Sequence, residues 1–224
     1  MIQKETFLAL QKELQQRQCT LVAVSKLKSV AAIQALYDLG QRDFGENYVQ
    51  ELVEKQAQLP KDIRWHFIGH LQSNKVKFIA PFVYMIHSVD SFKLIKEINK
   101  QGEVNQRKIN ILLQVYLGQE ATKFGMDEKE TLELLSYYDA QQNDLPFINI
   151  RGLMGMASFV EDEAILKHEF NALQQMFQIF KIQFFLGKED FDTRSMGMSG
   201  DYKIALDAGS NMVRIGSSIF GARS

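Results

Sequence analysis

Lys26 stands where a lysine could form a covalent bond with a carbonyl compound. It follows the apolar residues 21–24 and Ser25, and this run without polar alternation predicts a strand covered on both faces, as in a parallel sheet. Ligands of α/β proteins bind at the carboxyl ends of such strands. Desolvation there favours the neutral amine, which can attack a carbonyl carbon and form a Schiff base. The plainer alternative is a lysine whose stem packs on the rim while its charge reaches water.

Two stretches near the end of the chain have the residue types of a phosphate site. Residues 195–199 read Ser-Met-Gly-Met-Ser, and residues 214–218 read Arg-Ile-Gly-Ser-Ser. Gly216 lets the backbone approach an anion, the amides of Gly216 and Ser217 could point at it, and the hydroxyls of Ser195 and Ser217 could add donors. An ordinary strand-to-helix turn with an N-cap serine uses the same residue types, so the local sequence leaves both interpretations open.

A Schiff-base lysine and a phosphate cradle together describe a site for an aldehyde that carries a phosphate. Pyridoxal 5'-phosphate is such a molecule. Arg214 would then face the pyridine nitrogen, and its permanent cation would discourage protonation of the ring, which suppresses carbanion chemistry of the transaminase kind. The alternative for Arg214 is a salt bridge with one of the many carboxylates at the end of a barrel.

The elements that must position these residues alternate along the chain. Predicted helices begin with residues 2–17 and 30–39, the latter capped by Ser29, and continue with 46–59, a helix from Ser73, 92–102, a helix around 132–135, 161–181 and 199–208. Between them lie predicted strands at residues 21–26, 42–45, 64–69, 83–88, 108–116, 146–154, 193–197 and 212–216.

This alternation predicts a parallel sheet with helices outside it. Eight strand–helix units indicate a closed (β/α)8 TIM barrel, here a single domain over residues 1–224 with an extra N-terminal helix; an open doubly wound sheet is the alternative. In a closed barrel the first and last strands are neighbours, so Lys26 and residues 214–218 would meet.

Composition points to a cytoplasmic protein. The 224 residues carry a formal net charge of -1, which gives no electrostatic reason to expect nucleic acid or an anionic membrane as a partner. Cys19 is the only cysteine, so no internal disulfide can form. The N-terminus lacks the apolar core of a signal peptide, and the longest apolar run, residues 78–86, is short and contains Pro81. Because a closed barrel has no free edge, a monomer is expected.

The chain resembles the YggS/PROSC family of pyridoxal phosphate homeostasis proteins, which are similar to the barrel domain of alanine racemase standing alone. Seven segments carry the resemblance in the family's order, at residues 22–26, 44–51, 65–75, 88–91, 152–154, 195–199 and 213–216. Two residues depart from the family's pattern. Tyr116 replaces an asparagine after the fifth strand, which puts ligand access in doubt, and Arg194 replaces a leucine.

The resemblance implies a binding protein that stores, buffers or delivers pyridoxal phosphate without catalytic turnover, with apoenzymes that need this cofactor as its partners. It implies a set of cofactor-binding residues: Lys26 as the Schiff base, Arg214 at the ring nitrogen, Asn47 near the ring, and Ser195, Gly216 and Ser217 at the phosphate. No catalytic residue is implied.

Two other functions use the same lysine. A pyridoxal-phosphate-dependent amino-acid racemase would use Lys26 as a base, but racemases of this kind add a β-rich domain with an opposing tyrosine, and we expect none here. A cofactor-free aldolase is the third possibility.

The remaining candidates are weaker. His66 and His70 are separated by a predicted strand end and turn, and no cysteine or carboxylate completes a ligand set, so no metal site is expected. His87 and His168 stand isolated in the sequence. The methionines near the site suit core packing, and a loop with charged residues could serve function or solubility; these are Met154, Met156, Met196 and Met198, and Glu120 and Lys123.

Overall fold

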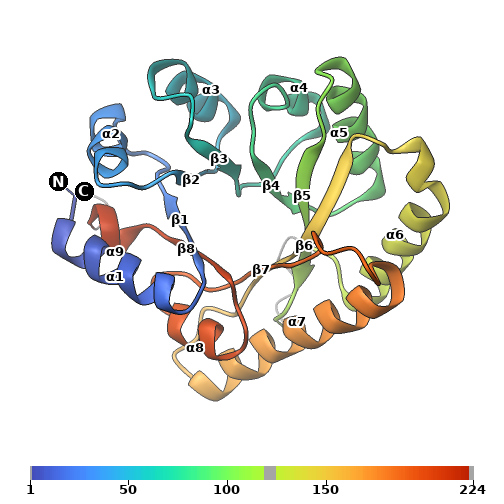
Figure 1. Cartoon of the computed structure of the whole chain (residues 1–224). Coiled ribbons are helices and arrows are strands. Elements are labelled where there is room, and N and C mark those ends of the chain that lie inside the picture. The colour runs from blue at the N-terminus through green and yellow to red at the C-terminus, as the bar shows by residue number, and fades with distance from the viewer. Residues whose placement is uncertain (1, 119–124, 222–224) are drawn as a thin grey trace.

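The computed structural model describes residues 2–118 and 125–221, and its strands close into a barrel (Figure 1). Every neighbouring pair of strands is parallel, and the order around the barrel follows the order along the chain. The strands are β1 (Thr20–Val24), β2 (Asp43–Glu46), β3 (Arg64–Phe67), β4 (Met85–Val89), β5 (Ile109–Tyr116), β6 (Ile148–Met156), β7 (Thr193–Ser195) and β8 (Met212–Ile215). The predicted (β/α)8 barrel is confirmed, and the open doubly wound alternative is wrong.

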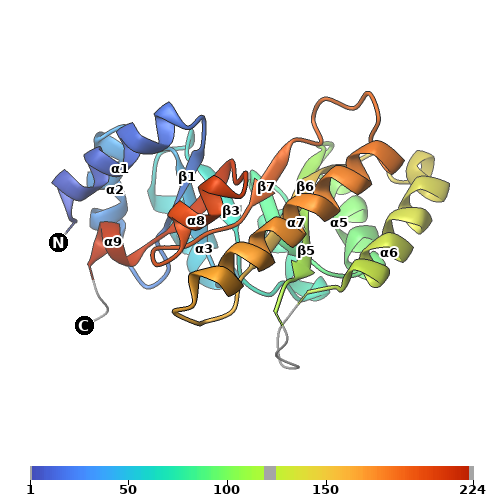
Figure 2. The ribbon, with the colours of Figure 1, turned by 90° about the horizontal axis from the view of Figure 1, so that it is seen from below.

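Helices cover the outside of the barrel, and α7 is the longest of those described (Figure 2). The predicted cap Ser29 is confirmed, because its hydroxyl accepts from Ala32 N. For α5 the sequence allows either Asp90 or Ser91 as the cap, and the structure shows Ser91, whose hydroxyl accepts from Leu94 N. The helices are α1 (Lys4–Gln16), α2 (Val30–Asp38), α3 (Val49–Gln58), η1 (Ser73–Lys75), α4 (Val76–Ile79), α5 (Phe92–Val104), α6 (Glu128–Gln141), η2 (Gln142–Asp144), α7 (Glu163–Phe184), α8 (Tyr202–Asp207) and α9 (Ser217–Phe220).

Several predicted helix bounds are wrong: α3 begins at Val49, because Glu46 belongs to β2, and α7 continues to Phe184. Gly102 lies inside α5 rather than closing it, and the helix continues to Val104. A Cβ atom at position 102 would lie 2.7 Å from Phe147 Cβ, so the missing side chain allows α5 to approach the segment that leads into β6. The glycine therefore serves packing, not capping.

Alternation along the strands divides the side chains between two cores. Outward residues such as Trp65, Phe67 and Ile86 pack against the helices in the larger cluster. The inward residues include a small apolar cluster made of Val22, Met85, Leu112, Met154 and Met212. Several buried polar residues share the inward positions, and they are Asp43, His66, His87, Ser195 and Arg214. The barrel interior is thus a packed core that also contains polar groups.

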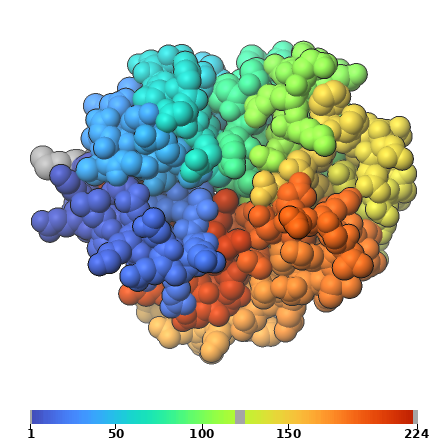
Figure 3. All heavy atoms as spheres, viewed as in Figure 1, coloured from blue at the N-terminus to red at the C-terminus, as the bar shows by residue number. Residues whose placement is uncertain are grey.

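The extra N-terminal helix is present and packs against β1 and α9. Phe7, Leu10 and Leu14 of α1 are buried at the spacing that the sequence predicts. The segment before α1 is joined to the last helix, because Gln3 N donates to the Ile219 carbonyl at 2.7 Å. The N-terminal and C-terminal segments accordingly lie side by side on the surface (Figure 3). No helix within residues 2–118 and 125–221 has the length and apolarity needed to cross a membrane.

Candidate cofactor site

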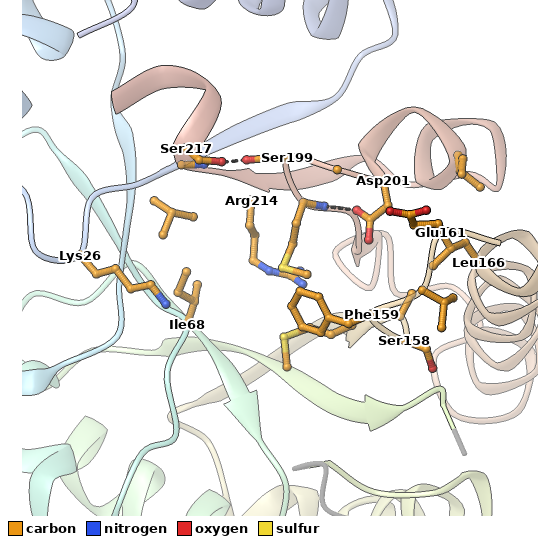
Figure 4. Close-up of a pocket in the computed structure, with 18 of the residues that line it drawn as sticks. Lys26, Ile68, Ser158, Phe159, Glu161, Leu166, Ser199, Asp201, Arg214 and Ser217 are labelled. Carbon is orange, nitrogen blue, oxygen red and sulfur yellow. Dashed lines mark hydrogen bonds between the residues drawn. The ribbon is translucent and has the colours of Figure 1, made fainter. Parts of the chain in front are cut away.

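A cavity of about 830 Å³ opens at the carboxyl ends of the strands (Figure 4). Its walls come from the segments that follow β1, β2, β3, β6, β7 and β8, the end of a parallel barrel at which ligands bind. Most of the predicted cofactor-binding residues line it, namely Lys26, Asn47, Arg214, Gly216 and Ser217. Residues from distant parts of the sequence therefore meet in one cavity.

Lys26 extends into this cavity from a tight turn after β1 (Figure 4). Lys28 N donates to the Ser25 carbonyl at 3.0 Å, and Leu27 has a φ of 61°, which is uncommon for a residue with a side chain. The Glu51 carboxylate accepts from Leu27 N at 2.6 Å and holds this conformation from α3. The turn thus fixes the backbone from which the Lys26 amine projects.

A buried ion cluster lies beneath the turn. Lys55 Nζ donates to the Ser25 carbonyl at 2.7 Å and to the carboxylates of Glu46 and Glu51 at 2.7 Å and 2.6 Å. The Ser25 hydroxyl donates to Glu46 at 2.6 Å. Burial raises the pKa of the Glu46 carboxyl, and the hydrogen bonds and charge of Lys55 oppose that rise. The cluster ties β1, β2 and α3 together directly behind Lys26.

Arg214 presents a buried guanidinium to the cavity from β8. Nη1 donates to both the carbonyl and the hydroxyl oxygen of Ser195 at 2.7 Å, and Nη2 donates to the Gly155 carbonyl at 3.0 Å. Burial lowers the pKa of Arg214 to about 10, which leaves it a cation at neutral pH. In the described part of the chain it forms no ion pair, so the salt bridge that the sequence left open is not found.

Ser195 has contacts that differ from those predicted. It is fully buried and does not line the cavity. Its hydroxyl accepts from Arg214 and lies 3.2 Å from His87 Nδ1, so these two neighbours occupy it. In this structure Ser195 is placed to hold Arg214 rather than to face a phosphate.

Another serine of the same motif reaches the predicted phosphate site. Ser199 lines the cavity beside Gly216 and Ser217, and its hydroxyl accepts from Gly216 N at 3.4 Å (Figure 4). A Cβ atom at position 216 would lie 3.1 Å from the Val24 carbonyl oxygen, so this glycine allows the end of β8 to approach the end of β1. The sequence placed Ser199 in a motif but gave it no role.

Asn47 supplies a polar atom that the protein itself does not satisfy. Its Oδ1 atom is buried, and no donor within residues 2–118 and 125–221 reaches it. Buried polar atoms are nearly always hydrogen-bonded in folded proteins, so an atom of this kind in a cavity wall suits a bound ligand. The residues therefore fit an aldehyde with a phosphate: they supply the Lys26 amine, the Arg214 cation, the Asn47 amide oxygen, and the hydroxyls of Ser199 and Ser217.

His87 is not isolated in space, which corrects the prediction from the sequence. Its ring lies between Ser195 and His66, with 2.8 Å separating His87 Nε2 and His66 Nδ1. His66 Nε2 in turn lies 3.0 Å from Asp43 Oδ1. The signal was present in the sequence, because Ile86 points outward and alternation then directs His87 into the barrel.

The other candidates lie elsewhere. His70 is half exposed and faces Asp90 at 3.9 Å, away from the inward-facing His66. Among the described residues, no group of three or more histidine, cysteine, aspartate or glutamate side chains could hold a metal ion. Met156 and Met198 line the cavity, Met154 belongs to the inner core and Met196 to the outer core.

The two departures from the family pattern do not enter the cavity wall. Tyr116, at the end of β5, is not among the described lining residues. Arg194 points outward, where its guanidinium lies 4.8 Å from the centroid of the Phe177 ring on α7. Glu120 and Lys123 lie outside the described residues.

Comparison with known proteins assigns the family. The sequence matches the family defined by the alanine racemase N-terminal domain over residues 4–224. It is 42% identical to the pyridoxal phosphate homeostasis protein of Vibrio alginolyticus over 208 residues, which cover 91% of this chain and 86% of that protein. The chain belongs to the pyridoxal phosphate homeostasis protein family. The resemblance seen in the sequence is therefore confirmed.

Solved structures agree with this family membership. PipY of Synechococcus elongatus PCC7942, in a structure with PLP bound, has a TM-score of 0.85 and 33% identity, covering 97% of this chain and 99% of that chain. An alanine racemase from Streptomyces lavendulae has a TM-score of 0.78 at 16% identity, covering 94% of this chain and 55% of that chain. The likeness to the racemase shows that this member of the homeostasis family has the racemase barrel fold.

Proposed function

We propose that this protein binds pyridoxal 5'-phosphate covalently as a Schiff base on Lys26 and stores, buffers or delivers it without catalytic turnover. The observation that carries the proposal is the meeting of Lys26 and Arg214 in one cavity, from neighbouring strands. Family membership supports it, since relatives are named for homeostasis of this cofactor and a related structure has PLP bound.

Six of the residues that line the cavity have a role in this proposal. The Lys26 amine would add to the aldehyde carbon, with loss of water, to give the covalent bond. Ser199, Gly216 and Ser217 would bind the phosphate through hydroxyls and backbone amides. Arg214 would face the ring nitrogen, and the Asn47 Oδ1 atom would accept a hydrogen bond from the ligand. We leave Ser195 out of the phosphate set because its hydroxyl is already occupied.

The charge of Arg214 argues against turnover of the transaminase kind. When bound, pyridoxal phosphate can supply an electron sink for carbanions, and protonation of its ring nitrogen strengthens that sink. Arg214 remains a cation at neutral pH and discourages that protonation. Tyr116, at the end of β5, is not among the described residues that line the cavity. We further propose a cytoplasmic monomer whose partners are apoenzymes that take up the cofactor.

Reduction and peptide mapping test the covalent bond. We expect the protein loaded with pyridoxal phosphate to absorb visible light and, after borohydride reduction, to carry the label on Lys26. Lys26→Ala should lose the label and the visible band. Lys28→Ala is the matched control, because Lys28 lines the same cavity, and it should keep both. A label that persists in Lys26→Ala would show that another lysine holds the cofactor.

Proton exchange tests the absence of turnover. The loaded protein would be incubated with single L-amino acids in deuterium oxide, and the α-proton signal followed by NMR. We expect no exchange at ordinary catalytic rates. Rapid exchange that requires Lys26 would instead identify a racemase.

A further inference from the structure

A line of hydrogen-bonded side chains crosses the barrel interior behind Arg214. We name it the interior chain, and its members are Asp43, His66, His87 and Ser195. Starting from Arg214 Nη1, successive polar atoms are separated by 2.7 Å, 3.2 Å, 2.8 Å and 3.0 Å. At the far end, Arg64 forms a two-point contact with the Asp43 carboxylate, and its side chain is 45% exposed. The interior chain therefore links the opposite end of the barrel to the cavity.

The interior chain is buried, so each of its polar groups needs a hydrogen-bond partner. Asp43 is 6% exposed, and the two histidines and Ser195 are completely buried. Apolar inward side chains such as Met85, Met154 and Met212 fill much of the same interior. An unpaired polar group costs more in such a core than at a surface. The buried position of Ser195 also means that this Ser–His–His–Asp set cannot present a nucleophile to a substrate.

The Asp43 carboxylate determines which atom carries the proton in each hydrogen bond of the interior chain. Burial alone raises the pKa of the Asp43 carboxyl, but the hydrogen bonds from Arg64 and His66 outweigh it and the net shift is downward. An ionised carboxylate only accepts, so His66 Nε2 must carry a proton and donate it. A His66 ring that carries only this proton accepts at Nδ1, and the proton between the two rings then belongs to His87 Nε2.

The same logic continues to Arg214. Burial lowers the pKa of His87 well below its usual value, and the positive charge of Arg214 acts in the same direction, so the His87 ring is neutral. A neutral His87 with a proton on Nε2 accepts at Nδ1, and the Ser195 hydroxyl must donate there. The lone pairs of that hydroxyl are then left for Arg214 Nη1. Along the interior chain, every N–H or O–H group then has an acceptor, and every accepting atom has a donor.

The opposite arrangement satisfies fewer groups. A doubly protonated His66 would donate to His87 Nε2, and His87 Nδ1 would then donate to Ser195. The Ser195 hydroxyl would accept from both His87 and Arg214, and its own proton would have no acceptor among the hydrogen bonds of the described residues. The one-directional arrangement is therefore the stable one.

We propose that the interior chain positions the Arg214 guanidinium at the cavity floor by fixing the Ser195 hydroxyl as its acceptor. Its members are positioning residues, since none of them touches the ligand site. All three acceptors of Arg214 are neutral oxygens, so the guanidinium keeps its net positive charge toward the cavity. The consequence for a bound pyridine nitrogen rests on the proposed function, whereas the proton directions belong to the protein alone.

Nitrogen-15 NMR of histidine side chains in the protein without cofactor tests the proton directions. We expect both buried rings to show protonated Nε2 and unprotonated Nδ1, with His87 unchanged down to pH 5. Signals would be assigned with single histidine-to-glutamine variants. A proton on Nδ1 of His87 would overturn the one-directional arrangement, whether or not the protein binds pyridoxal phosphate.

Substitution tests the positioning role. Cutting the chain with His87→Phe should weaken pyridoxal phosphate binding by about tenfold and shift the visible absorption of the bound cofactor, since a mispositioned Arg214 loses a charged contact. His87→Gln, which keeps one donor and one acceptor, should recover most of both. His168→Gln, on the exposed face of α7, is the control.

The outcomes separate the two proposals. If His87→Phe does not fold, Ser195→Ala interrupts the interior chain next to Arg214 with a smaller volume change. The same two measurements, cofactor affinity and visible absorption, then test the positioning role. Wild-type affinity and absorption in the folded variants would overturn the positioning role and leave the proposed function intact. Failure of the unmodified protein to bind pyridoxal phosphate would instead overturn the proposed function.

Discussion

Arg214 is a cation that the described part of the chain surrounds with neutral oxygen atoms. Its acceptors are two carbonyls and one hydroxyl, and Asp201 acts on it only through its charge at longer range. A salt bridge would neutralise the guanidinium and reduce its effect on a ligand. Because its acceptors are neutral, the Arg214 guanidinium keeps its positive charge toward the cavity, although burying that charge costs folding free energy.

Gly216 gives a prediction at the scale of one residue. Gly216→Val should weaken pyridoxal phosphate binding by about tenfold or more and lower the melting temperature only slightly, because the new side chain would press on Val24 and fill space at the proposed phosphate site. Gly200→Val is the matched control, since Gly200 lines the same cavity and a Cβ atom there meets nothing within 4 Å. Cofactor titration and thermal melting measure the two effects. An unchanged dissociation constant in Gly216→Val would count against the proposed cradle.

At the scale of elements, the turn after β1 depends on α3. Leu27 adopts a positive φ because the Glu51 carboxylate holds its amide, and Lys55 holds the Ser25 carbonyl from the same helix. Both residues of α3 also contact each other, one helical turn apart. The position of Lys26 is thus set by side chains that follow it by more than twenty residues.

Lys55→Met tests this coupling. The substitution leaves Glu46 and Glu51 without their cation, and losing one partner of a buried ion cluster costs about 3 to 5 kcal/mol. We therefore expect a large drop in the free energy of unfolding, measured by urea denaturation, and slower labelling of Lys26 by pyridoxal phosphate. Adding Glu46→Gln should return part of the stability, because it removes the unpaired buried charge.

An exposed lysine provides the control for that experiment. Lys129 lies 4.0 Å from Glu133 on the surface of α6, with its side chain 83% exposed. Exposed pairs contribute little to stability, so Lys129→Met should leave the unfolding curve almost unchanged. Equal effects of the two substitutions would contradict a special role for the cluster beneath Lys26.

At the scale of the whole molecule, the barrel is closed by the pairing of its first and last strands. Residues Val22 and Arg214 are partners in the β1–β8 register, and this pairing brings the two halves of the site together. Closure also leaves no unpaired strand edge among β1 to β8. Cys19, immediately before β1, lies buried at this seam, where it reports on global unfolding.

Cys19 predicts a loss of stability at alkaline pH. Burial raises the pKa of its thiol from 9.0 to about 12, so the folded protein keeps a proton that the unfolded chain releases. The resulting stability is fully present below pH 9 and falls by on the order of 1 kcal/mol per pH unit above it. In urea denaturation between pH 8 and pH 10.5 under reducing conditions, wild type should lose stability faster than Cys19→Ala. Parallel curves for the two proteins would contradict this.

The sequence by itself determined the barrel and placed five of the six predicted cofactor-binding residues in the cavity wall. Strand–helix alternation depends on local patterns of apolar residues, and the helix caps at Ser29 and Ser91 depend on neighbours within three residues. Because parallel strands of a barrel all end on one side, Lys26 and Arg214 could be brought together without knowledge of any side-chain contact. The family resemblance added the cofactor.

Only the tertiary structure decided which polar groups meet inside the barrel. His87 was counted as isolated and Ser195 was assigned to the phosphate, yet the two lie against each other although they are 108 positions apart in the chain. Alternation shows that each points inward, but the partner of an inward side chain depends on strand stagger and rotamer, which the sequence does not state. Hydrogen bonds also require distances near 3 Å, so contacts of this kind are settled by the packed fold rather than by local pattern.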